Sequence, residues 1–187
     1  ARTLIEYFHA QPSLAVMLLV PHLNPDLTGR LLAEKIRDSV YSEATLAMHI
    51  PGLKKTLFPF QKSGILQMSQ RSGRALLADG MGLGKTIQAL GFWRFNHLGK
   101  TLIVCPKSLM LNWRNEILQG LADIAPDQIF LFSDAQGNVP ADRLFYIINY
   151  DILEKWQASL GEAGCELLIL DEAHYIKNSH ARRTKSV

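Results

Sequence analysis

The stretch from residue 75 to residue 90 restricts the possible folds of this chain more than any other segment. An apolar run at residues 75–78, typical of a buried strand, is followed by a glycine-rich turn and then by a helical pattern. Three glycines and a Lys-Thr pair stand out in the turn: Gly80, Gly82, Gly84, Lys85 and Thr86. Glycines let backbone N–H groups curl around phosphate oxygens, and a helix start directs its positive dipole end at the same anion. The order predicts a nucleotide-phosphate site, and Met81 and Leu83 belong to the same loop.

The residue types of this loop fit a triphosphate with a metal. Lys85 can reach the β- and γ-phosphates, and the Thr86 hydroxyl can bind Mg²⁺. The strict pattern G-x-x-x-x-G-K-[ST] asks for glycine at position 79, where Asp79 stands. The alternative is a glycine-rich turn without a ligand, and the strand–turn–helix context favours the phosphate site.

A second motif lies about ninety residues further on, where an apolar strand ends in Asp171-Glu172. Asp171 can hold Mg²⁺ opposite Thr86, and Glu172 can orient or deprotonate an attacking water. Taken alone, the pair also fits a strand exit with solvated acids. Together with the glycine-rich loop, it indicates nucleotide hydrolysis.

Composition and charge exclude few classes of protein. Of 187 residues, 48% are apolar and 20% charged, which is typical of a globular domain. The net charge of +3 is compatible with a nucleic-acid partner but does not by itself indicate one.

The two cysteines indicate reduced, buried thiols inside the cell, and no Cys/His spacing suggests zinc. The apolar run 14–20 is too short to span a bilayer, and no signal peptide is expected. Because the first residue is Ala, we expect a piece of a longer protein.

Two regions differ in their periodicity. Residues 1–50 have helical spacing, with a helix start at Asn24-Pro25-Asp26 and a break at Pro51-Gly52. We therefore predict a small helical extension over 1–52 and an α/β domain over 53–187. Within that domain, strands are expected at 75–79, 101–105, 128–132, 145–149 and 166–170. Helices are expected at 65–69, 85–96, 109–118 and 152–159. This alternation predicts a doubly wound, mostly parallel sheet.

Five segments in order resemble one known family, the first (N-terminal) RecA-like motor lobe of superfamily 2, Swi/Snf-type helicase-like ATPases. The segments are 57–61 (LFPFQ), 79–89 (DGMGLGKTIQA), 104–109 (VCPKSL) with Trp113, 148–153 (INYDIL), and 171–174 (DEAH) with 176–178 (IKN). The LFPFQ sequence is most similar to that of the branch of the family that anneals or remodels forked DNA. One departure is Gly80, where the family usually has an acid.

The resemblance implies ATP and Mg²⁺ as ligands, with Gln61 contacting adenine. Charge alone assigns no role to His174, and we expect it to couple nucleotide state to another element. The resemblance also implies double-stranded DNA as partner, with contacts from Lys107 and Ser108 and from Asn149 and Tyr150. A second RecA-like lobe with an arginine finger is expected in the same polypeptide, so this lobe alone should hydrolyse ATP poorly. The implied location is intracellular, in the cytoplasm or nucleoid of a bacterium or in a eukaryotic nucleus.

The residues alone leave other interpretations open. Gln61 also fits a surface helix start, Lys107-Ser108 a capped helix with a solvated Lys, and Asn149-Tyr150 a capped turn. Trp113 lies at helical spacing with other apolar residues, which favours core packing. For the whole chain, a degenerate non-catalytic docking module, an RNA helicase lobe and a P-loop kinase remain as alternatives.

Overall fold

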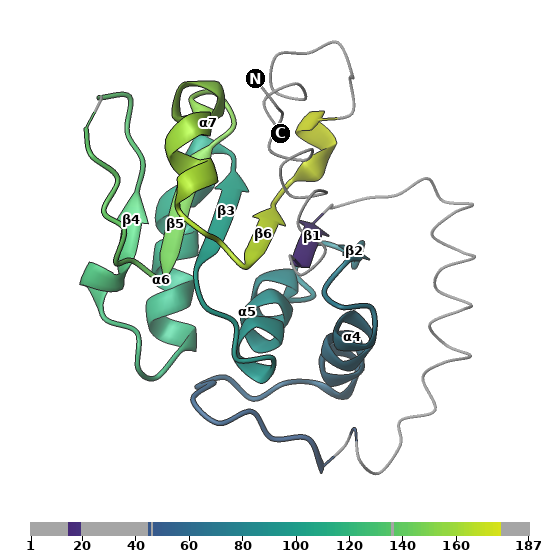
Figure 1. Ribbon diagram of the computed structural model, residues 1–187. Coiled ribbons are helices and arrows are strands. Elements are labelled where there is room, and N and C mark those ends of the chain that lie inside the picture. Colours follow the sequence, from purple (N-terminus) through teal and green to yellow (C-terminus); the bar gives the residue numbers. More distant parts are fainter. Residues whose placement is uncertain (1–14, 20–44, 46, 136, 177–187) are drawn as a thin grey trace.

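Six parallel strands form the central layer in the computed structural model of the chain, which describes residues 15–19, 45, 47–135 and 137–176. The strand order is β2-β1-β6-β3-β5-β4, and these strands pair with one another in parallel. The strands are β1 (Ala15–Leu19), β2 (Ala75–Leu77), β3 (Thr101–Cys105), β4 (Ile129–Leu131), β5 (Phe145–Asn149) and β6 (Leu167–Leu170). Figure 1 shows the sheet with its flanking helices.

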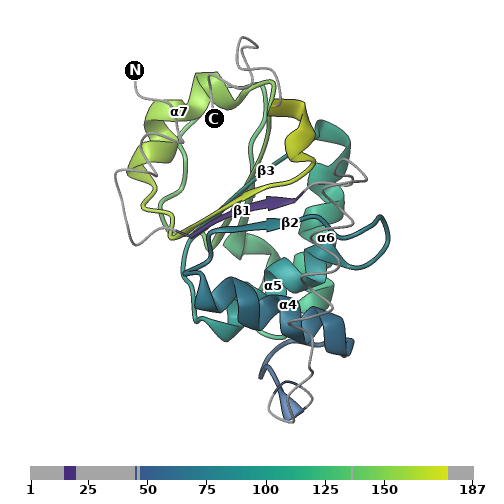
Figure 2. The ribbon, with the colours of Figure 1, turned by 90° about the vertical axis from the view of Figure 1, so that its right-hand side faces the viewer.

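Helices cover both faces of this sheet. The α-helices are α4 (Pro59–Gln70), α5 (Lys85–Phe95), α6 (Met110–Gly120) and α7 (Leu153–Glu162). Three short 3₁₀ segments follow strands or precede them: η1 (Lys107–Leu109), η2 (Pro126–Gln128) and η3 (Ala173–Ile176). In Figure 2, α4, α5 and α6 lie on one side of the sheet and α7 on the other. The predicted doubly wound α/β fold is confirmed.

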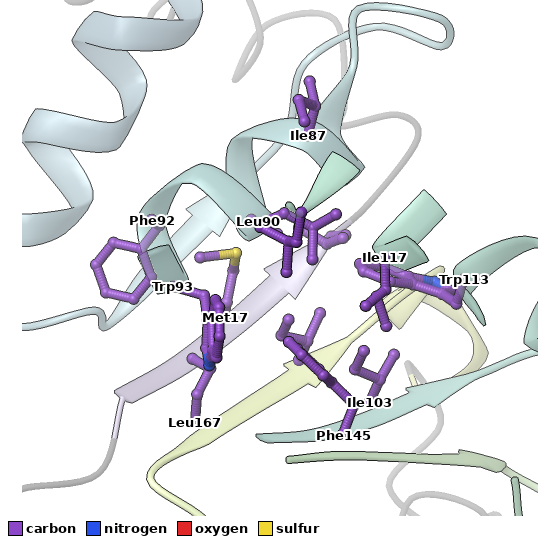
Figure 3. Close-up of a cluster of buried hydrophobic side chains, with 14 of the residues drawn as sticks. Met17, Ile87, Leu90, Phe92, Trp93, Ile103, Trp113, Ile117, Phe145 and Leu167 are labelled. Atoms are coloured by element: carbon purple, nitrogen blue, oxygen red, sulfur yellow. The ribbon is translucent and has the colours of Figure 1, made fainter. Parts of the chain in front are cut away.

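Alternate residues of each central strand enter two separate apolar clusters. In β3, Ile103 and Cys105 face the helices α5 and α6, whereas Leu102 and Val104 face α7. Figure 3 shows the first cluster, in which Trp93 packs against Phe145 with ring centroids 4.9 Å apart. Because both faces are covered, the central strands are apolar at nearly every position, which explains their appearance in the sequence.

Most predicted elements are present, with shifted ends. The strands 101–105 and 145–149 have the predicted bounds, and the other three are one or two residues shorter. The helix predicted over 65–69 begins earlier, at Pro59. Proline is favoured in the first turn, and the Gln61 side chain accepts a hydrogen bond from the Phe58 N–H, so this earlier start is stabilised locally.

The N-terminal segment corrects one prediction. Helical spacing places residues 15–19 within a helical extension, but Ala15–Leu19 forms β1 and pairs with both β2 and β6. Met17 and Leu19 are fully buried. A short apolar run carries no alternation when both of its faces are buried, so its period cannot separate strand from helix. The extension proposed over 1–52 therefore does not hold for 15–19, and the helix predicted from residue 24 lies outside the described residues.

Residues on both sides of the predicted boundary at 52/53 pack onto the α/β core. Ile50 is buried in the first cluster, and Leu53 forms an isolated antiparallel bridge with Leu121. Among the described residues, no helix has both the length and the apolar character needed to cross a bilayer.

Candidate nucleotide-binding site

The glycine-rich loop and the acidic pair leave the sheet at the same edge. Strand β1 lies between them and pairs in parallel with both, at Leu19↔Leu77 and at Leu18↔Leu170. Neighbouring strands are about 4.8 Å apart, so the ends of β2 and β6 lie about 10 Å from one another. The fold thus brings together two motifs that are about ninety residues apart in the chain.

The glycine-rich loop is held in a tight curve by left-handed glycines. Gly82 has φ +79° and Gly84 has φ +75°, and Gly84 is the N-cap of α5. The Lys85 ammonium donates to the carbonyl oxygens of Asp79 at 2.8 Å and of Gly80 at 3.1 Å. The cation therefore lies inside the curve of the loop, where an anion would meet it.

Asp79, the departure from the strict phosphate-loop pattern, anchors the start of the loop. Gln88 of α5 is fully buried, and its Nε2 donates to Asp79 Oδ2 at 2.7 Å. Gly64 of α4 lies against this amide, since a Cβ at position 64 would be 2.4 Å from Gln88 Oε1. The aspartate thus ties the loop to α5, and the absent side chain at position 64 lets α4 approach.

Gln61 connects α4 to the phosphate loop. Its Oε1 accepts from the Phe58 N–H at 2.9 Å, and its Nε2 donates to the Leu83 carbonyl at 3.0 Å. The side chain is 5% exposed. An amide can make four hydrogen bonds, so one donor and one acceptor position remain beyond these two contacts.

Asp171 follows β6 and is fixed by four hydrogen bonds. Its backbone N–H donates to the Val104 carbonyl at 2.8 Å, and its own carbonyl accepts from the Tyr150 hydroxyl at 2.8 Å. On the carboxylate, Oδ1 accepts from the Glu172 N–H at 2.9 Å, and Oδ2 accepts from Trp113 Nε1 at 2.8 Å. The orientation of this carboxylate is therefore set by the protein itself.

The environment of Asp171 is apolar overall. Burial raises the pKa of its carboxyl above the usual range, and the Glu172 charge acts in the same direction. Hydrogen bonds from Trp113 and from the Glu172 N–H, with the charge of Lys85, oppose this pKa rise. A cation near the carboxylate favours its charged form.

Glu172 adopts a backbone conformation that is rare for a side-chain-bearing residue, with φ +53°. Such geometry occurs at functional sites more often than elsewhere. His174 Nδ1 lies 3.0 Å from Glu172 Oε2, which is ion-pair distance for a protonated imidazole but lacks hydrogen-bond geometry. The His174 ring also contacts Tyr175, with centroids 4.7 Å apart.

The predicted DNA contacts separate into two groups. Lys107 and Ser108 are exposed in η1, directly after the carboxyl end of β3, and Lys107 Nζ lies 3.2 Å from Asp134 Oδ2. Asn149 and Tyr150 are each only 3% exposed. Tyr150 hydrogen-bonds the Asp171 backbone, and Asn149 Oδ1 accepts from the Asp151 N–H. Both side chains are buried and bonded within the domain, so their contact with DNA stays a prediction.

Oxygen donors suited to Mg²⁺ are present at this edge. Thr86 is the second residue of α5, and Asp171 presents a carboxylate from across β1. Hydroxyl and carboxylate oxygens are the ligands that this hard cation prefers, together with phosphate and water. The described residues contain no cluster of three or more His, Cys, Asp and Glu side chains that could hold a metal by themselves. The donor set therefore fits a metal that arrives with a phosphate ligand.

Comparison with known proteins identifies the family. Residues 60–187 match the family model of the SNF2-related domain. The chain belongs to the SNF2-related domain family. DNA annealing helicase and endonuclease ZRANB3 of Mus musculus is 34% identical over 140 residues, which cover 71% of this chain and 13% of that protein. DNA repair and recombination protein RAD54B of Homo sapiens is 34% identical over 162 residues, 73% of this chain and 17% of that protein.

A solved structure supports the same assignment. The Sulfolobus solfataricus SWI2/SNF2 ATPase core in complex with dsDNA matches with a TM-score of 0.65 and 26% identity. The match covers 74% of this chain and 31% of that one. This SNF2-related domain therefore has the RecA-like α/β fold of a first motor lobe, and it spans only a small part of its relatives.

Two residues of this SNF2-related domain have contacts that sequence reasoning missed. Helical spacing places Trp113 in the core, and it is buried, but its indole also reaches Asp171. The sequence assigns Gln88 no role, and it binds Asp79. A buried glutamine between apolar helix positions was the available signal for Gln88, whereas no local pattern indicated the contact of Trp113.

Proposed function

We propose that this domain is the first motor lobe of an ATP-dependent translocase on double-stranded DNA, of the Swi/Snf type. The observation that carries the proposal is the convergence of the phosphate loop and the acidic pair at one sheet edge. Catalytic turnover requires a second lobe.

Each site residue has a defined task in ATP hydrolysis. Backbone N–H groups of residues 80–86 bind the phosphates, and Lys85 exchanges its two loop carbonyls for β- and γ-phosphate oxygens. Thr86 and Asp171 hold Mg²⁺, which when bound neutralises charge on the phosphates. Glu172 orients the attacking water and accepts its proton.

Gln61 and His174 link the bound nucleotide to other parts of the protein. The remaining donor and acceptor of the Gln61 amide suit the edge of adenine, which presents one acceptor beside one donor. The hydrogen bond from Gln61 to the Leu83 carbonyl also ties the Gln61 side chain to the phosphate loop. His174 lies against Glu172, so we assign it the coupling of nucleotide state to movement.

The DNA partner is proposed from the exposed segment after β3 and from the relatives. Lys107 and Ser108 present a cation and a hydroxyl, which suit a phosphate of a DNA backbone. Relatives are named as DNA annealing and DNA repair proteins, and the S. solfataricus core was solved with dsDNA. Such a motor acts inside the cell, in a nucleoid or a nucleus.

The isolated domain tests the division of labour between lobes. It should bind Mg²⁺–ATP weakly and hydrolyse it slowly with or without duplex DNA, because an arginine finger from a second lobe supplies about 10³–10⁵ in rate. The measurement is steady-state ATPase activity, with Lys85→Ala as the control. Fast DNA-stimulated turnover that Lys85→Ala abolishes would show that one lobe suffices.

Two other functions give different outcomes. A non-catalytic docking module predicts no binding of Mg²⁺–ATP in calorimetry, although Lys85, Thr86, Asp171 and Glu172 are all present. An RNA helicase lobe predicts that RNA, rather than duplex DNA, stimulates the ATPase activity of the longer protein. Comparing both nucleic acids on that longer protein separates the two motors.

A further inference from the structure

One buried tryptophan makes a polar contact at the acidic end of the proposed site. Trp113 lies on α6, is 1% exposed, and donates from Nε1 to Asp171 Oδ2 at 2.8 Å. Figure 3 shows the ring packed beside Ile117 of the same helix. The apolar packing holds the ring in place, so the N–H has a fixed direction.

This contact completes the restraint on the Asp171 carboxylate. The Glu172 N–H binds Oδ1 and the indole binds Oδ2, so rotation of the carboxylate breaks a hydrogen bond at either oxygen. A carboxylate has about four acceptor positions, so each oxygen keeps one for a metal or its water. The indole therefore fixes the carboxylate and still leaves an acceptor position on each of its oxygens.

The other two tryptophans show that this contact is specific to Trp113. Trp93 Nε1 donates to the Gly99 carbonyl at 2.9 Å, just before β3 and therefore at the opposite edge of the sheet from Asp171. Trp156 Nε1, on α7, has no hydrogen-bond partner among the described residues. Trp93 is thus a matched control, since it is buried on the same face and loses a comparable bond when replaced by Phe.

We propose that Trp113 is a positioning residue that presets the Asp171 carboxylate for the metal of a Mg²⁺–nucleotide, an inference that rests on the proposed function. Partners that orient a metal ligand in this way typically contribute about 10–100-fold to metal affinity. The helix that carries the indole begins directly after η1, which contains Lys107 and Ser108, so the proposed DNA segment and the metal ligand's partner are adjacent in the chain.

Calorimetry with ADP as the probe tests this on the whole 187-residue chain. Trp113→Phe should weaken Mg²⁺–ADP binding about 10-fold or more, and ADP binding in EDTA should stay unchanged, because the base and the loop contacts remain. Trp93→Phe should leave both affinities unchanged. Equal effects of Trp113→Phe with and without Mg²⁺, or equal effects of both variants, would overturn the positioning role.

The indole N–H signals provide a second readout, recorded on the unsubstituted chain. The three tryptophans give three such signals in a ¹⁵N–¹H spectrum, assigned by single Phe substitutions. Mg²⁺–ADP should shift the Trp113 signal, ADP in EDTA should shift it less, and the Trp93 signal should stay in place. An equal shift of the Trp113 signal with Mg²⁺–ADP and with ADP in EDTA would contradict the proposal.

The outcomes separate this inference from the proposed function. If the unmodified chain does not bind Mg²⁺–ADP, the nucleotide site itself is wrong; if it binds and Trp113→Phe binds equally well, only the role of Trp113 is wrong. Should Trp113→Phe fail to fold, benzothienylalanine at position 113 keeps the ring shape and removes the N–H. The same loss of Mg²⁺-dependent affinity is expected with that replacement.

Discussion

Two glycines of the phosphate loop need the same backbone conformation but have different surroundings. Gly82 and Gly84 both have positive φ, which side-chain-bearing residues adopt at a cost of about 1–2 kcal/mol. A Cβ at position 82 would meet nothing within 4 Å. A Cβ at position 84 would lie 2.6 Å from Gln61 Nε2 and 3.0 Å from Ile87 Cγ2. The pair therefore separates backbone strain from crowding.

We predict that Gly84→Ala destabilises the domain more than Gly82→Ala does. Both variants adopt the strained φ, but the methyl group added at position 84 also displaces the Gln61 amide from the Leu83 carbonyl. A lost hydrogen bond is worth about 1 kcal/mol, which lowers Tm by roughly 2–4 °C in a domain of this size. Thermal unfolding of both variants without nucleotide measures the difference. Equal losses of Tm would mean that Gln61 moves aside freely.

The residues with proposed chemical tasks could be predicted from the sequence, and their positioning partners could not. Phosphate and metal binding restrict both residue type and spacing, so Lys85, Thr86 and Asp171 are visible in the chain. The indole of Trp113 reaches Asp171 across 58 positions, and no periodicity records such a contact. The burial of Tyr150 was missed for the same reason, because its hydroxyl bonds a backbone carbonyl 21 residues away.

At the scale of elements, the sequence predicted the central strands best and the N-terminal strand worst. Strands β3 and β5 have continuous apolar runs bounded by polar residues and helices, so their length and context are readable. Strand β1 is equally apolar but lies inside a region of helical spacing. Its identity as a strand comes from its two neighbours, β2 and β6, which follow it by more than fifty residues.

The segment after β3 carries the prediction for DNA. Lys107→Ala should weaken binding to duplex DNA a few-fold and reduce the salt dependence of log K by about one unit, as expected for one lost phosphate contact. Lys100→Ala is the control, since Lys100 precedes the same strand at the opposite edge of the sheet. Fluorescence anisotropy at several salt concentrations measures both. An unchanged salt slope for Lys107→Ala would remove this segment from the DNA surface.

For the molecule as a whole, the two apolar clusters hide both thiols. Cys105 lies in the cluster under α5 and α6, and Cys165 in the cluster under α7. Burial raises the pKa of each thiol to about 12. The charge of Asp171 adds to the pKa rise of Cys105, while Lys100 partly opposes that of Cys165. In the folded domain a thiolate therefore forms only at strongly alkaline pH.

This places a specific pH dependence on the stability of the whole domain. An unfolded thiol ionises near its ordinary pKa of about 8.5, whereas the folded thiols keep their protons until about pH 12. Between these values the unfolded state binds fewer protons, so the free energy of unfolding falls as pH rises through this window. Well below the unfolded pKa, the two thiols contribute no slope. Urea titrations from neutral to alkaline pH measure the effect, and a variant with Ser at both positions should show a smaller alkaline loss of stability.

The burial of the two thiols also predicts their reactivity. A thiol reagent at mildly alkaline pH should label both cysteines only in denaturant. Rapid labelling of the native chain would show that one cluster opens without global unfolding.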